Sequence, residues 1–417
     1  MQHILLLLPS ETYRAADFIQ AAAQLGTRVT VGSDRRNPIA NSDEAVIELP
    51  LKNPELAADA ITEYASEAPL HAIVAVDDQG VITAALASDR LKLPYNSPQA
   101  VAATRNKADM RHRLAAYGVP QPAYAVLQAA SDPHREAECL GYPVVVKPVS
   151  LSASQGVIRV DDPNELQPTL ARVQKILHER GRPKHEALLL EQFVPGSEVA
   201  VEGLMRNGRL EVLAIFDKPD PLDGPFFEET LYVTPSRHTD AIQSEISSVT
   251  AQAAEALGLT EGAIHAELRT SSCQTSILEI AGRSIGGLCA RALRFGLGVS
   301  LEQLILRHAL NLPIHDLQRT DGASGVMMLP IPQAGRLVEV TGVDHAQAIE
   351  GITGVEITIA PGQLLIPLPE GNRYLGFIFA RGHHPSQVEA ALRAAHKQLR
   401  FSIETNCDKS ATASSIT

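Results

Sequence analysis

Short apolar segments alternate with helix-length segments through the first ninety residues of the chain. Residues 4–8 are one isoleucine and four leucines in an unbroken run that ends at Pro9. Such a run is typical of a strand buried on both faces of a parallel sheet. Helix and strand patterns then follow in turn, at 13–25, 28–31, 55–65, 72–76 and 81–91. This order predicts a doubly wound parallel α/β domain over residues 1–96.

Composition excludes several classes of protein. The net charge of −12 disfavours non-specific binding to nucleic-acid phosphates, so no nucleic-acid partner is expected. The first apolar run is far shorter than the roughly 18 residues that span a bilayer, and no basic segment or cleavage site accompanies it. The four cysteines form no CxxC pair, which is typical of reduced thiols. We therefore expect a cytoplasmic protein without a membrane partner.

The 417 residues are enough for two to four domains. Ser97-Pro98 predicts the start of a single helix that runs to about Tyr117. We expect a domain over 97–310 that contains a smaller subdomain at 121–195, which would act as a closing lid, and a C-terminal α+β domain over 311–405. The Ser/Thr/Ala-rich segment 406–417 is predicted to be disordered.

A lysine and a hydroxyl-rich loop lie between two predicted strands. Lys147 ends the apolar run 144–148, and the loop that follows contains Ser152, Ser154, Gln155 and Gly156. The loop leads into another strand, so it is not a Walker loop, but its N–H groups and hydroxyls suit phosphate oxygens. An ordinary polar hairpin with a surface lysine is the alternative.

An acidic stretch follows the apolar strand 188–190. Glu191 and Glu198 lie at its two ends. Their carboxylates can accept hydrogen bonds from an amino group and from ribose hydroxyls. Solvated carboxylates at the end of a strand would give the same pattern.

Two alternating segments, 263–269 and 275–281, predict an antiparallel hairpin with its centre at Cys273. This register places Glu267 directly opposite Glu279, and the repulsion between them would be relieved by Mg²⁺. Continued alternation places Arg283 on the same face, about 13 Å from Glu279 at ~3.3 Å per residue. The alternative is an exposed sheet face of mixed charge, and a shift of one residue in the register would separate the acids.

The order of these motifs resembles the ATP-grasp superfamily over about residues 1–310. The resemblance implies two clasping α+β subdomains and a site for ATP with Mg²⁺ or Mn²⁺. Glu267 and Glu279 match the metal-binding acids. The adenine hinge is matched by the segment Glu191, Gln192, Phe193 and Val194. The implied ATP-binding residues are Lys107, Lys147, Ser152, Ser154, Gln155, Gly156, Glu191, Gln192, Phe193, Val194 and Glu198.

Finer details are similar to L-amino-acid ligases, also called dipeptide synthetases. The similar segments are 217–229, 265–269 and 279–287. The resemblance implies catalytic roles for two residues. Arg283 would stabilise an anionic intermediate, and Lys218 would contact the γ-phosphate of ATP. It implies a substrate site formed by Glu228, Glu229, Ser284, Gly286 and Gly287. The loop 217–235 also fits a rigid surface loop, and Ala281 stands where many ATP-grasp proteins have a metal-binding asparagine.

These observations predict an ATP-dependent carboxylate–amine ligase that forms an amide bond through an acyl phosphate, with an amino acid as a substrate. The resemblance allows a homodimer. Two alternatives stay open, namely a carboxylase or carbamoyl-phosphate-synthase-like enzyme that uses bicarbonate or a small acid, and a non-catalytic nucleotide-binding protein.

Overall fold

The computed structural model describes residues 1–405 except 11, 36–44, 272–273 and 321. The segment 406–417, which we predicted to be disordered, lies outside the described residues. Contacts divide the chain into two compact units. Unit 1 comprises residues 1–126, 192–219 and 234–322, and unit 2 comprises 127–191, 220–233 and the chain from 323 on. The domain boundaries given above remain predictions.

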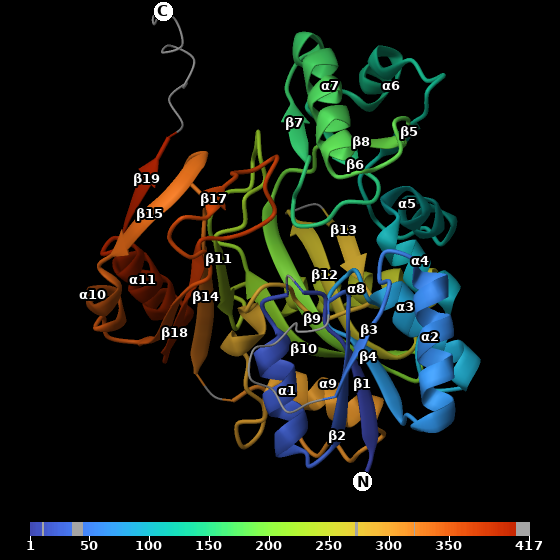
Figure 1. The fold of residues 1–417 in the computed structure, drawn as a ribbon. Coiled ribbons are helices and arrows are strands. Elements are labelled where there is room, and N and C mark those ends of the chain that lie inside the picture. Colours follow the sequence, from blue (N-terminus) through green and yellow to red (C-terminus); the bar gives the residue numbers. More distant parts are fainter. Residues whose placement is uncertain (11, 36–44, 272–273, 321, 406–417) are drawn as a thin grey trace, which may run out of the picture. The chain divides into compact units, whose positions relative to one another are not determined.

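Unit 1 begins with a parallel sheet in the order β3-β2-β1-β4. The strands are β1 (His3–Leu7), β2 (Arg28–Ser33), β3 (Ala45–Glu48) and β4 (Ala72–Ala75). Helix α1 (Ala15–Gln24) lies on one side of the sheet, and α2 (Pro54–Glu67) and α3 (Val81–Leu91) lie on the other (Figure 1). All five residues of the apolar run 4–8 are buried, as a strand covered on both faces requires. The predicted parallel α/β fold is confirmed.

Antiparallel strands form the second sheet of unit 1, in the order β13-β12-β9-β10. Their bounds are β9 (Ser197–Arg206), β10 (Arg209–Asp217), β12 (Gly262–Thr270) and β13 (Thr275–Ala281). Helix α8 (Asp240–Leu257) packs on this sheet, capped by Thr239 at its start and by left-handed Gly258 at its end. The short helix η1 (Cys289–Ala292) and α9 (Leu301–Ala309) follow.

The prediction of one helix from 98 to 117 is wrong, because the chain forms two helices there. Helix α4 (Pro98–Arg105) ends before Asn106, and α5 (Lys107–Ala116) begins after it. Asn106 has an extended backbone, and its side chain accepts hydrogen bonds from the N–H groups of Ala108 and Asp109. An asparagine caps a helix better than it continues one, so the break places Lys107 at the first position of α5.

Unit 2 contains strands β8-β6-β7 in that order, with α6 (Pro133–Leu140) and α7 (Pro163–Glu179). Strands β11-β14-β18-β16 form a second layer, and β17-β15-β19 form a small sheet. The strands of the first two groups are β6 (Val144–Pro148), β7 (Ile158–Val160), β8 (Leu188–Gln192), β11 (Leu231–Thr234), β14 (Ala323–Leu329), β16 (Ile352–Ile357) and β18 (Gly376–Gly382). The remaining elements are β15 (Gly335–Thr341), α10 (Val343–Gln347), β17 (Leu364–Leu365), α11 (Pro385–His396) and β19 (Arg400–Glu404). Strand β5 (Tyr124–Leu127) crosses the boundary between the units.

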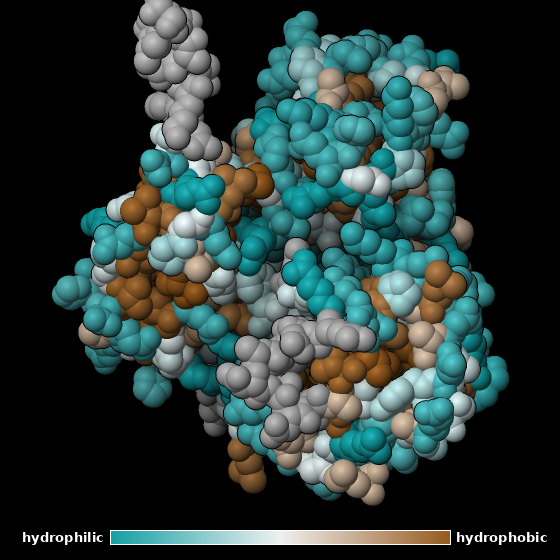
Figure 2. Space-filling view, in the orientation of Figure 1, coloured by the Kyte–Doolittle hydropathy of each residue, from teal (hydrophilic) through white to brown (hydrophobic). Residues whose placement is uncertain are grey.

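Most of the face in view is polar, and its apolar side chains gather in a few patches (Figure 2). In unit 2 the exposed apolar residues include Val338, Leu364 and Ile366, on or next to β15 and β17. Among the described residues, no helix combines the length and the hydropathy needed to cross a membrane.

Candidate active site

The hairpin β12–β13 carries the two acids that the sequence singled out. Glu267 pairs with Glu279, so the predicted register is confirmed at this point. Nearer the turn the register differs by one residue, since Leu268 pairs with Ile277 and a bulge lies between the two stretches. Cys273, the predicted centre of the turn, lies outside the described residues. Directly opposed residues of an antiparallel pair share a face, so both carboxylates lie on the same side of the sheet.

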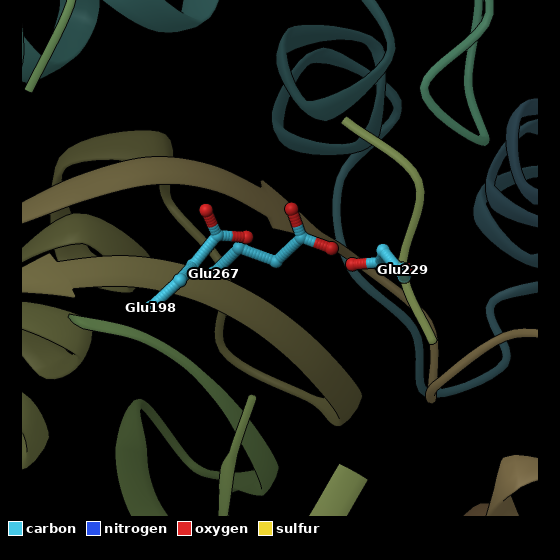
Figure 3. Close-up of side chains that lie close together, drawn as sticks. All are labelled: Glu198, Glu229 and Glu267. Carbon is cyan, nitrogen blue, oxygen red and sulfur yellow. The ribbon is translucent and has the colours of Figure 1, made fainter. Parts of the chain in front are cut away.

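Glu267 also has an acidic neighbour on β9. Carboxylate oxygens of Glu198 and Glu267 lie within 4.8 Å of one another (Figure 3). The ammonium of Lys218 joins them, at 2.8 Å from Glu198 Oε1 and 3.5 Å from Glu267 Oε1. The side chains of Lys218 and Glu198 are almost fully buried, whereas that of Glu267 is 26% exposed. Grouped carboxylate oxygens are the ligands that a hard divalent cation prefers.

Arg269 connects Glu198 to the predicted adenine hinge. Its Nε lies 3.0 Å from Glu198 Oε2, and its Nη1 donates to the carbonyl of Val194 at 2.8 Å. The guanidinium lies over the ring of Phe193, 4.9 Å from the centroid. Both oxygens of Glu198 therefore have a cationic partner, and the ribose-binding role of Glu198 stays a prediction.

The second acid, Glu279, is paired with Lys107. The Lys107 ammonium lies 3.2 Å from Glu279 Oε1, and only 9% of the lysine side chain is exposed. The break at Asn106 thus directs the first residue of α5 to β13. Each acid of the hairpin has its own buried lysine, which offsets the repulsion between the two carboxylates.

Arg283 lies beyond the hairpin. We predicted that β-alternation continues to this residue, which is wrong, because β13 ends at Ala281. Its Nε and Nη2 donate to the two carboxylate oxygens of Asp78, at 2.7 and 3.0 Å, and Arg105 also lies 3.1 Å from Asp78. Burial alone would lower the pKa of Arg283, but the carboxylates of Asp78, Asp77 and Glu279 raise it above its ordinary value. The side chain is therefore a permanent cation.

His265 lies on β12 between two acids. Its Nδ1 is 3.2 Å from Glu202 Oε2, and its Nε2 is 3.7 Å from Glu267 Oε1. Burial alone would lower the pKa of His265, but hydrogen bonds and charges from Glu202 and Glu267 outweigh it and raise the pKa to about 9. At neutral pH the imidazole is protonated, which adds a second cation beside Glu267, next to Lys218.

In unit 2 the predicted phosphate-binding elements adopt the expected topology. Strands β6 and β7 are antiparallel, and the hydroxyl-rich loop, with Ser152 and Ser154 in it, connects them. Lys147 at the end of β6 forms an ion pair of 2.6 Å with buried Glu191 at the end of β8. Gln192 follows Glu191 as the last residue of β8.

The end of this loop is tied to the segment before β18. The N–H of Gly156 donates to the carbonyl of Pro369 at 2.9 Å, and the side-chain amide of Gln155 donates to the carbonyl of Glu370 at 2.5 Å. The Glu370 carboxylate in turn accepts two hydrogen bonds from Arg172 of α7. Gly156 has a φ of +71°, a left-handed conformation that favours glycine.

The predicted substrate-binding residues fall in both units, and each set is described separately. In unit 2, Glu229 accepts a hydrogen bond of 2.7 Å from the hydroxyl of Tyr232, and burial raises the pKa of Glu228. In unit 1, Ser284 is buried, and Gly287 has a φ of +58°. A Cβ added at Gly286 would meet no atom within 4 Å, so this position has open space around it.

Three family models match successive parts of the chain. The ATP-grasp N-terminal domain matches residues 19–95, the ATP-grasp domain matches 140–292, and the L-amino acid ligase C-terminal domain 2 matches 327–404. The chain belongs to the ATP-grasp superfamily. The predicted membership and its resemblance to amino-acid ligases are therefore confirmed.

Among ATP-grasp relatives, Dapdiamide A synthase of Enterobacter agglomerans is 29% identical over 310 residues, which cover 71% of each protein. Alanine–anticapsin ligase of Bacillus subtilis is 25% identical over 272 residues, 61% of this chain and 57% of that protein. The alignment thus spans less than two thirds of the latter relative. The crystal structure of L-amino acid ligase from Bacillus licheniformis has a TM-score of 0.80 at 25% identity, and the match covers 97% of this chain and 99% of that one.

The sequence did not identify four charged residues of this candidate site, namely Arg14, Asp78, Glu202 and Arg269. Asp78 had a signal, because it follows an apolar strand of a parallel sheet, where ligands gather. Glu202 and Arg269 lie within strands, and without the pairing of β9 with β12 their alternation does not reveal that they are buried. His265 lay within a segment that resembles the family, but no role followed from the sequence alone.

Proposed function

We propose that this chain is an ATP-dependent carboxylate–amine ligase that joins an amino acid to an amine through an acyl phosphate. The observation that carries the proposal is the pair Glu267 and Glu279, opposed on one sheet face with a buried lysine at each. The family matches support the reaction class, since an ATP-grasp domain precedes an amino-acid-ligase C-terminal domain in the chain.

The reaction has two steps in this proposal. A carboxylate oxygen of the first substrate attacks the γ-phosphorus of ATP, the bond from phosphorus to the β-phosphate oxygen breaks, and ADP leaves. The amine of the second substrate then attacks the acyl carbon, phosphate leaves with the electron pair of the carbon–oxygen bond, and the amine loses a proton. Phosphoryl transfer depends mainly on positioning and on charge neutralisation, so no nucleophilic side chain is needed.

The donor set fits Mg²⁺ or Mn²⁺. Glu198, Glu267 and Glu279 offer carboxylate oxygens from neighbouring strands, which are hard ligands suited to these ions. When bound, such an ion neutralises charge on the phosphate oxygens during transfer. Because Ala281 stands where many ATP-grasp proteins have a metal-binding asparagine, the number of bound ions is open. Titration calorimetry with Mg²⁺ and a non-hydrolysable ATP analogue measures that number.

Cationic side chains have separate roles in the proposal. Lys107, Lys147 and Lys218 neutralise the phosphates, and Arg283 stabilises the oxyanion that forms when the amine attacks. Oriented donors at such an oxyanion typically contribute about 3–4 kcal/mol to the rate. Glu228 or Glu229 receives the ammonium group of an amino-acid substrate. Ser284 with Gly286 and Gly287 lines the site of a substrate carboxylate.

Incubation with ATP, Mg²⁺ and pooled amino acids tests the proposal. ADP and phosphate should appear only when both an acid and an amine are present, and mass spectrometry should detect the amide product. Hydroxylamine should trap the acyl phosphate as a hydroxamate. Release of AMP and pyrophosphate would contradict the mechanism, and turnover that depends on bicarbonate would support a carboxylase instead.

The variants Glu267→Gln and Glu279→Gln should lose turnover, whereas Glu302→Gln should retain it. Glu302 is a matched control, since it is a buried glutamate of unit 1 on α9 that is not among the predicted site residues. We also propose a cytoplasmic homodimer, which light scattering and cell fractionation test separately from the activity.

A further inference from the structure

Three consecutive residues beyond β13 are each held by a different part of unit 1. Arg283 is bound by Asp78, which follows β4. The hydroxyl of Ser284 accepts a hydrogen bond of 2.7 Å from Arg14, just before α1. The N–H of Ile285 donates to both carboxylate oxygens of Glu202 on β9, at 3.1 and 3.0 Å. The segment is therefore fixed on its backbone as well as on its side chains.

Glu202 is the unusual member of this arrangement. It is fully buried in β9. A carboxylate in such a place costs several kcal/mol of desolvation unless hydrogen bonds compensate it. Within the described part of the chain, its hydrogen bonds go to the N–H of Ile285 and to His265. Both oxygens are thus used to join the segment after Arg283 to β12, the strand that carries Glu267.

The fixed segment determines which N–H groups of Arg283 remain for a substrate. A guanidinium has five N–H groups. Within the described residues, three of those of Arg283 are engaged, two by Asp78 and one by the carbonyl of Ser284. This leaves one N–H on each terminal nitrogen, and their direction depends on where the backbone of 283–285 lies. An oxyanion donor is effective only when it is oriented before the reaction.

We propose that Glu202 is a positioning residue that holds the segment 283–285 against β9, so that the guanidinium of Arg283 points in one direction. The inference rests on the proposed function for its effect on turnover, but its effect on the segment can be measured without activity. Glu202 itself touches no substrate. It acts through the backbone N–H of Ile285.

Two variants test this role. Glu202→Met removes both acceptors while keeping a side chain of similar length, and Glu202→Gln keeps one acceptor oxygen. Hydrogen exchange of a peptide that covers 282–287 should become at least tenfold faster in Glu202→Met and change less in Glu202→Gln. The matched control Glu302→Met, another buried glutamate of unit 1, should leave exchange in this peptide unchanged.

Kinetics provide the second measurement. We expect Glu202→Met to lower kcat at least tenfold while KM for ATP stays within twofold, because the phosphate-binding lysines are not altered. In a background of Arg283→Lys, the Glu202→Met change should lower kcat by less than threefold, since both changes affect the same donor. If Glu202→Met fails to fold, Glu202→Gln carries both measurements.

Unchanged exchange at 282–287 in a folded Glu202 variant would overturn the inference. So would fully multiplicative effects of the Glu202 and Arg283 changes on kcat. Absence of ATP turnover in the unaltered protein would instead overturn the proposed function, and the exchange comparison would still decide the role of Glu202.

Discussion

Lys218 offers a direct test of the charge arrangement in unit 1. Its ammonium lies between Glu198 and Glu267, and 2% of its side chain is exposed. Lys218→Met keeps the length of the side chain but leaves the buried Glu198 carboxylate with Arg269 as its remaining cationic partner. Removal of one partner from a buried ion pair typically costs about 3–5 kcal/mol. Because Arg269 still compensates part of the charge, we expect a loss of about 3 kcal/mol in the free energy of unfolding.

The matched control is Lys92→Met, in the same unit. Lys92 also pairs with an acid, at 3.6 Å from Asp89 Oδ1, but 81% of its side chain is exposed. Exposed pairs of this kind contribute roughly 0–1 kcal/mol, and this one should be near the lower limit. The two variants therefore carry the same lysine-to-methionine substitution and differ in whether the ion pair is buried or exposed.

Urea denaturation followed by circular dichroism measures both variants, because the chain contains no tryptophan for fluorescence. Both substitutions lie in unit 1, so the same transition can be compared. ATP turnover should fall at least a hundredfold in Lys218→Met and stay unchanged in Lys92→Met. A Lys218→Met protein within 1 kcal/mol of the unaltered protein would refute the reasoning, since Glu198 would then need no second cation.

Three further predictions concern other charged groups. Lys147→Met should raise KM for ATP at least tenfold in steady-state kinetics, because it removes the cation paired with Glu191; an unchanged KM would contradict a nucleotide-binding role. Glu370→Ala should raise KM for ATP about threefold with little change in kcat, since Arg172 would no longer hold the segment that anchors Gln155; Glu179→Ala, on the same helix as Arg172, should change neither. His265 has a pKa raised from 6.5 to about 9, so its stabilising charge is fully present below pH 6.5 and is lost as the pH rises through 9. Between these limits, metal-free protein should lose up to about 3 kcal/mol of unfolding free energy in denaturation experiments, and His265→Gln should lose clearly less.

The sequence predicted those features that depend on local patterns. The apolar run 4–8 indicated a parallel sheet, because few other structures bury five consecutive apolar side chains beside helix patterns. The order of lysines and acids indicated the family. The break between α4 and α5 was missed because Asn106 was counted as a helical residue, although its side chain competes with the helix and caps the next one.

Contacts between distant segments could not be predicted in this way. Arg283 and Asp78 are 205 residues apart, and Arg14 and Ser284 are 270 apart. Nothing in the local pattern around Ser284 indicates that the guanidinium of Arg14 binds it. Such pairs arise when tertiary packing brings two strand ends together, and single-sequence periodicity carries no information on which ends meet.

The opposition of Glu267 and Glu279 was predicted correctly from an incomplete description of the hairpin. Near the turn, Leu268 pairs with Ile277, and a regular continuation of this register would place Glu267 opposite Leu278. Alternation would then have put one acid on each face of the sheet, since a slip of one residue reverses the side chains. The bulge between Glu267 and Leu268 inserts the extra residue that restores the pairing of the acids. The paired carboxylates therefore depend on the bulge as much as on the alternation, and a substitution that regularised the hairpin would separate Glu279 from Glu267 without changing either residue.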